Sequence, residues 1–144
     1  GDYNTFMTFD VRILAAINFS VQVLLMIAVF FAAYVAKKKK EFRKHCTILR
    51  VAIFLQIIAI LFVMLPSITG YILNEEKGIF FNTELLIHHF LGISVVLLWV
   101  YINLVVAGRI KLFGSLVFYM RMVMSLWVLT FLIGLHVYWL MLAD

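Results

Sequence analysis

The stretch that decides the fold is ELLIHHFLGISVVLLWVYINLVVAG, which runs from Glu84 to Gly108. It is long enough to cross a bilayer, because a transmembrane helix needs about 20 mostly apolar residues. His88 and His89 lie inside it. Ionisable side chains at membrane depth are costly unless they have partners, so a histidine pair in this stretch points to a functional site. We interpret one of the two imidazoles as a ligand of a cofactor, with haem iron the favoured metal.

The composition places the whole chain in the membrane. Of its 144 residues, 66% are hydrophobic and 13% are charged, whereas soluble domains are about half apolar and about a quarter charged. One proline and seven glycines indicate long helices with few connections. The single cysteine excludes an intramolecular disulfide and a multi-cysteine metal site. We therefore predict an all-α integral membrane protein with a single domain over residues 1–144.

Four apolar segments divide the chain. We predict spans over about 11–36, 46–73, 83–108 and 117–142, which pack as an antiparallel four-helix bundle. Residues 1–10 are predicted to lie at the membrane interface, and Pro66 to kink the second span. No cleavable signal peptide is expected, because the first apolar run is too long and follows an acidic stretch.

The charges predict the orientation. Ten of the twelve Lys and Arg residues lie in or beside the loops that join spans one to two and three to four. The positive-inside rule then puts both loops in the cytoplasm and both termini outside a cell (plasma) membrane. Because the cations cluster at helix ends, the bilayer is the expected partner and nucleic acid is not. The run Lys37–Lys40 is a topology signal that contacts anionic lipid, or a dedicated lipid- or partner-docking patch.

Two histidines from different spans are predicted at matched depth. His89 and His136 each lie about six residues inside the outer end of their span, roughly 9 Å below the surface at 1.5 Å per residue. One imidazole above and one below the ring is what a six-coordinate haem b requires. His88 and His89 differ by about 100° around the helix, so only one can point squarely into the site. We favour His89, because its face continues to Asn103, and we place His88 at the outer interface.

Other residues could support such a haem site. Asn18 lies at comparable depth in the first span and could orient a ligating imidazole by a hydrogen bond. Gly92 removes side-chain bulk beside the histidines, and Arg12 lies where haem propionates would emerge. His45 lies at the opposite boundary, where a His/Met haem or a soft-metal site is an alternative.

The order of these features resembles the CtaM/YozB group, the DUF420 family of small four-span membrane proteins. The resemblance covers most of the chain, with Asn18 in the first span, a basic loop before His45, and His89 in the third span. Its pattern in the last span is Trp127, Gly134 and Tyr138. It implies a role in the assembly of haem-copper cytochrome oxidase.

Two positions depart from that family. Met120-Arg121 stand where the family tends to carry His-Arg, and His136 stands where it usually has an apolar residue. On this comparison His136 is a local addition that would complete a haem site. The architecture is also similar to that of four-helix b-type cytochromes, which pair histidines for two haems.

Three functions follow from these patterns. The favoured one is a small b-type cytochrome that holds one haem b between spans three and four and transfers single electrons, with a quinone and a redox protein as candidate partners. The second is a non-catalytic assembly or cofactor-handling factor that contacts oxidase subunits. The third is a proton or metal transporter that uses His88, His89 and His136 as a relay. Structural hydrogen bonding between helices is the alternative to all three.

Overall fold

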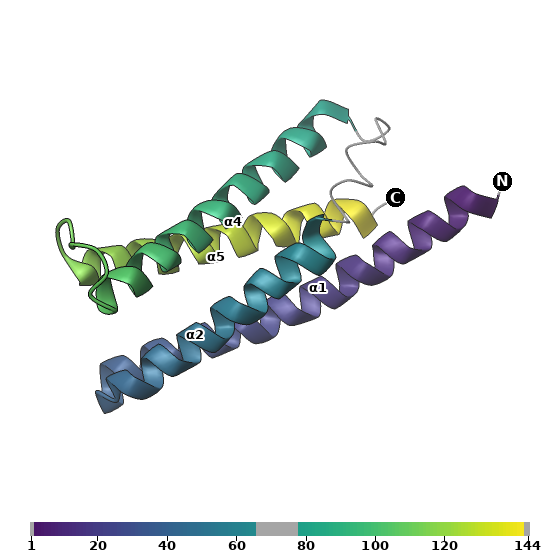
Figure 1. Ribbon diagram of the computed structural model, residues 1–144. Coiled ribbons are helices and arrows are strands. Elements are labelled where there is room, and N and C mark those ends of the chain that lie inside the picture. The colour runs from purple at the N-terminus through teal and green to yellow at the C-terminus, as the bar shows by residue number, and fades with distance from the viewer. Residues whose placement is uncertain (1, 66–77, 143–144) are drawn as a thin grey trace. The chain divides into compact units, whose positions relative to one another are not determined.

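The computed structural model describes the backbone of residues 2–65 and 78–142, and the side chains of residues 13–65 and 83–140. Within these ranges the chain is helical and contains no strand, as predicted. The elements are α1 (Asp2–Tyr34), the π-helix η1 (Val35–Lys39), α2 (Phe42–Ala59), the π-helix η2 (Ile60–Met64), α4 (Gly78–Val106) and α5 (Leu116–Leu142) (Figure 1).

Four helical stretches in the described residues are long and apolar enough to cross a membrane. They are Ile13–Lys39, Phe42–Met64, Thr83–Val106 and Leu116–Leu140. Large apolar side chains stay exposed along all four stretches, as expected for helices that face lipid. These properties support a multi-pass membrane protein.

The helix bounds refine the predicted spans. α1 already begins at Asp2, because no glycine or proline interrupts residues 2–34, so residues 2–10 are helical. α2 begins at Phe42 because the basic segment turns within two residues. Lys40 makes that turn with a left-handed φ of 54°. The predicted end of the second span and the kink at Pro66 lie outside the described residues.

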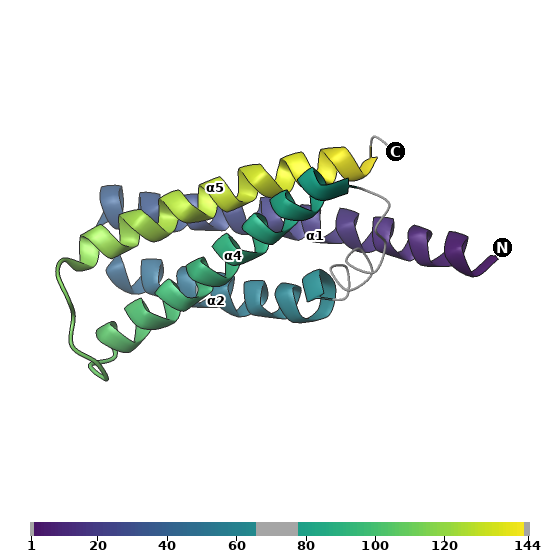
Figure 2. The same cartoon turned by 90° about the horizontal axis from the view of Figure 1, so that it is seen from above.

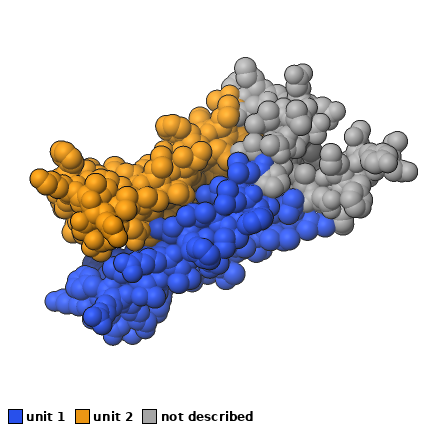
Figure 3. Space-filling model, viewed as in Figure 1, with its two compact units in different colours: residues 1–76 blue, residues 77–144 orange. Residues whose placement is uncertain are grey.

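The chain divides into two compact units, residues 1–76 and 77–144 (Figure 3). Two views at right angles show that the first unit is a hairpin of α1 and α2 and the second a hairpin of α4 and α5 (Figures 1 and 2). The predicted association of all four helices into one bundle stays a prediction.

Polar bonds and small side chains hold α1 against α2. Gln22 Nε2 donates to Gln56 Oε1 over 2.7 Å, and His45 Nδ1 donates to the carbonyl of Ala32 over 2.8 Å. The two pairs run in opposite order along the helices, so the hairpin is antiparallel. Ala32 and Ala52 are buried between them, and such small residues let helix backbones approach closely.

A row of buried side chains joins α4 to α5. Trp99 and Trp127 are 6% and 4% exposed, and their rings meet edge to face with centroids 5.6 Å apart. The connecting loop turns at Gly108 and Gly114, whose φ values of 74° and 88° favour glycine. Apolar residues of the predicted spans three and four thus supply part of the face on which these two helices pack.

Candidate functional site

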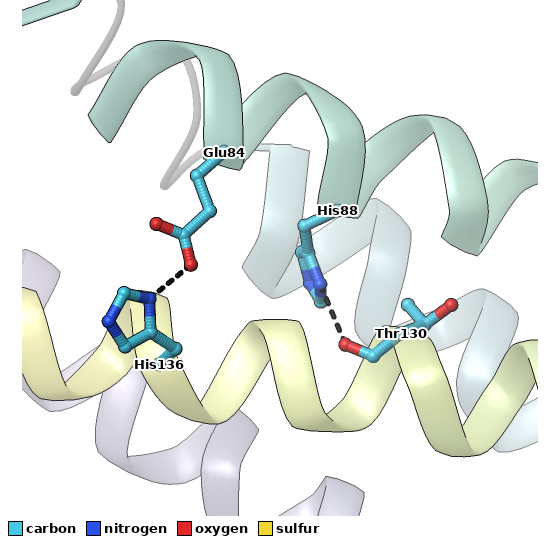
Figure 4. A network of polar contacts seen from close by, with 4 residues as sticks. All are labelled: Glu84, His88, Thr130 and His136. Atoms are coloured by element: carbon cyan, nitrogen blue, oxygen red, sulfur yellow. Dashed lines mark hydrogen bonds and ion pairs between the residues drawn. The ribbon is translucent and has the colours of Figure 1, made fainter. Parts of the chain in front are cut away.

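Four titratable side chains gather towards one end of the α4–α5 hairpin. α4 carries Glu84, His88 and His89, and α5 carries His136. Glu84 and His88 are four residues apart, so they share one face of α4. Figure 4 shows both side chains pointing from α4 towards α5.

The Glu84 carboxylate holds the imidazole of His136. His136 Nδ1 is hydrogen-bonded to Glu84 Oε1 (Figure 4). An ionised carboxylate can only accept, so Nδ1 carries the proton and donates it. When the ring is neutral, Nε2 keeps a free lone pair, and the His136 side chain is 59% exposed. This is a histidine whose second nitrogen can take a ligand.

His88 has a different role, because its ring fills a notch in α5. Its Nδ1 donates to the carbonyl of Thr130 over 3.0 Å. A Cβ placed on Gly134 would lie 2.8 Å from His88 Cε1 and 3.5 Å from His88 Nε2. The absence of a side chain at Gly134 therefore makes room for this imidazole, and the ring acts as a packing element between the helices.

His89 is bonded within its own helix. Its Nδ1 donates to the carbonyl of Leu85 over 2.7 Å. Its ring meets that of His88 edge to face, with centroids 5.2 Å apart. Within this unit His88, and not His89, points at α5. The predicted choice of His89 as the ligand stays a prediction.

The described contacts do not bring His89 and His136 together. His136 lies opposite Glu84, whereas His88 lies opposite Thr130. His136 is therefore about one helical turn nearer the end of the hairpin than the histidine pair. The sequence predicted matched depth from residue spacing within each helix. That spacing does not include the register between α4 and α5.

A haem lying between α4 and α5 does not fit this packing, because the contact of His88 with Gly134 closes the interface at that level. The hydrogen bonds of the histidines, however, are of the kind that iron-binding imidazoles make. His88, His89 and His136 each engage Nδ1 with an oxygen, the arrangement that orients metal-binding imidazoles through Nε2. Among the described residues, no group of three or more His, Cys, Asp or Glu side chains could hold a metal ion.

The predicted supporting residues have other neighbours. Asn18 Oδ1 accepts from Gln22 Nε2 over 3.3 Å, so its amide is engaged within the α1–α2 unit. A Cβ on Gly92 would lie 3.9 Å from Thr130 Cγ2, so this glycine faces α5 at an ordinary packing distance. The His45 imidazole joins α2 to α1 through Ala32. The side chain of Arg12 lies outside the described residues.

Sequence reasoning missed three partners: Glu84 for His136, and Thr130 and Gly134 for His88. The periodic pattern held part of the signal, because Glu84 and His88 share a face with Val95 and Trp99, both of which are buried. Which residues of α5 meet that face depends on the helix register, and this pattern does not give the register.

Comparison with known proteins finds no matching family model, no matching characterised protein and no matching solved structure. The resemblance to the CtaM/YozB group therefore stays a prediction.

Proposed function

We propose that this chain is a small b-type cytochrome of the membrane, in which His136 ligates one haem b and the protein transfers single electrons. The observation that supports this proposal is the bond between Glu84 and His136. A carboxylate that accepts the ring N–H fixes the tautomer, aims Nε2 and makes the imidazole a better ligand. When bound, the haem supplies the one-electron exchange.

The site proposed here lies at the Glu84 end of the α4–α5 hairpin and not between the two helices. His136 is more than half exposed there, so a flat group can approach its Nε2 without parting α4 from α5. His89 is the alternative candidate to His136 as the ligand. Its Nδ1 is hydrogen-bonded to Leu85, so its Nε2 is left for a metal. His88 is excluded from this role, since its ring is packed on Gly134.

Haem titration of the purified full chain tests this assignment. His136→Ala should abolish the haem spectrum, and Glu84→Gln should weaken haem binding about 10- to 100-fold, the usual cost of losing such an outer partner. The matched control is His45→Ala, which removes from the other unit an imidazole whose Nδ1 is also hydrogen-bonded to an oxygen, the backbone carbonyl of Ala32. If His136→Ala binds haem as tightly as His45→Ala, His136 is not a ligand.

A cofactor-handling factor for a haem-copper oxidase is the second candidate function. The observation that favours it is the 59% exposure of His136, because an exposed ligand can release its cofactor to another protein. Mixing the haem-loaded chain with apomyoglobin separates the two functions. Haem transfer within seconds supports a handling factor, whereas retention for hours supports a cytochrome. Deletion of the gene should lower oxidase haem content only if the protein is a handling factor.

A transmembrane relay has less support. On the face of α4 that carries Glu84 and His88, the next buried residues are Val95 and Trp99. Neither side chain exchanges protons, so the packed face of α4 does not continue the polar cluster inwards.

We further propose a plasma-membrane location with both basic loops in the cytoplasm and both termini outside. The support is the charge distribution, with ten of the twelve Lys and Arg residues in or beside those loops. The Glu84–His136 pair then lies in the outer leaflet.

A further inference from the structure

The turn between α1 and α2 carries the densest charge in the chain. Its cations are Lys37–Lys40 on the α1 side and Arg43 and Lys44 on the α2 side, and Glu41 is the one acidic residue among them. We call these six cations the basic turn. All six residues are exposed. None of Lys37–Lys40 forms an ion pair within the described part of the chain, so their charges are available to an external anion.

Hydrogen bonds to carbonyl groups of neighbouring residues hold the backbone of the basic turn in place. Val35 is fully buried, and its carbonyl accepts the N–H groups of Lys40 and Glu41. Below the turn, His45 Nδ1 donates to the carbonyl of Ala32. The cations are thus presented by a fixed turn, so less conformational freedom is lost when a ligand binds.

Exposed aromatic side chains lie beside these cations. Phe31, Tyr34 and Phe42 are 45%, 51% and 63% exposed, and the Lys44 ammonium lies 5.7 Å from the centre of the Phe31 ring. A soluble polyanion would use the charges only, whereas a phospholipid can place its phosphate on the cations and its acyl chains along these rings. This combination of charge and apolar surface favours a lipid.

We infer that the basic turn is a binding site for anionic phospholipid, and that it prefers a headgroup with two phosphates, such as cardiolipin, over one with a single phosphate. The two groups of cations, one on each side of the turn, give each phosphate its own partners. Basic pockets between transmembrane helices bind such headgroups in the same way. The inference is independent of the haem proposal, because it concerns the α1–α2 unit alone.

Native mass spectrometry of the detergent-solubilised full chain tests this inference by titration with cardiolipin, phosphatidylglycerol and phosphatidylcholine. For the wild-type chain the expected order of affinity is cardiolipin, then phosphatidylglycerol, then phosphatidylcholine. Inorganic phosphate and a short oligonucleotide are titrated in parallel, because they carry the charge without acyl chains. Equal binding of phosphatidylglycerol and phosphatidylcholine, a lack of preference for cardiolipin, or tighter binding of the oligonucleotide would each overturn the inference without any variant.

Two matched double variants locate the site. Lys37→Gln/Lys38→Gln removes two exposed cations from the basic turn, and Arg109→Gln/Lys111→Gln removes two from the other basic loop. A cation near an anionic surface contributes about 1 kcal/mol, and 1.4 kcal/mol is a tenfold change in affinity. The first variant should therefore bind cardiolipin at least about tenfold more weakly, and the second within about twofold of wild type. Equal losses in the two variants would mean unspecific attraction and would refute a site at the basic turn.

Discussion

The imidazole of His88 on α4 occupies the place that a side chain at Gly134 on α5 would take. A Cβ at residue 134 would lie 2.8 Å from His88 Cε1, and the same ring donates to the carbonyl of Thr130 one turn earlier on α5. His88 is an ionisable residue in an apolar helix, and these contacts give it both a hydrogen-bond partner and close packing. The relationship explains how one histidine of the pair can be structural, which leaves His136 as the residue for which we propose a cofactor role.

Gly134→Ala should destabilise the α4–α5 hairpin. The new methyl group would force the His88 ring out of its notch and away from Thr130, and overpacking of this kind costs about 1–3 kcal/mol. Thermal unfolding of the full chain in detergent measures the effect. In a His88→Ala background the same substitution should cost much less, because the clashing ring is gone.

Gly92→Ala is the matched control for that prediction. Its Cβ would meet Thr130 Cγ2 at 3.9 Å, an ordinary contact, and alanine favours the helix by up to about 1 kcal/mol over glycine. The control should be neutral or stabilising. Equal destabilisation by the two substitutions would show that the notch at Gly134 is not special.

Gln22 and Gln56 should be energetically coupled across the α1–α2 hairpin. Their 2.7 Å bond joins two helices in an apolar setting, where such bonds contribute about 0.6 kcal/mol on average and at most about 1.7 kcal/mol. A double-mutant cycle with Gln22→Leu and Gln56→Leu, followed by unfolding in detergent, should return a coupling in that range. Ser20→Ala serves as the control, because the Ser20 hydroxyl donates to the Ala16 carbonyl of its own helix. A coupling energy of zero would show that the Gln22–Gln56 bond does not stabilise the hairpin.

Cysteine labelling tests the proposed topology. In a Cys46→Ser background, Lys39→Cys and Ser115→Cys each place a thiol at an exposed position in a basic loop, and Thr83→Cys places one at the opposite end of α4. A membrane-impermeant maleimide should label Thr83→Cys in intact cells, and the two loop positions only after permeabilisation. Labelling of the two loop cysteines from opposite sides would contradict an even number of crossings between them.

The sequence predicted the helices better than it predicted the site. Long apolar runs are a local property, so the presence of four long apolar helices could be predicted from them. Which α4 residue meets which α5 residue depends on the register between helices. The pairing of Glu84 with His136 depends on that register, so spacing within one helix does not show it. Gly134 carries no side chain, so its role in making room for the His88 ring is seen only in the packed helices.

The absorption spectrum of the full chain, purified from haem-supplemented cells and recorded oxidised and then dithionite-reduced, tests the central claim most directly. The account predicts a Soret band and a sharp reduced α-band in the wild-type protein. Both bands should be lost in His136→Ala and kept in His88→Ala, because the His136 side chain is exposed whereas the His88 ring is packed on Gly134. A colourless wild-type protein, or a His136→Ala protein with an unchanged spectrum, would contradict it.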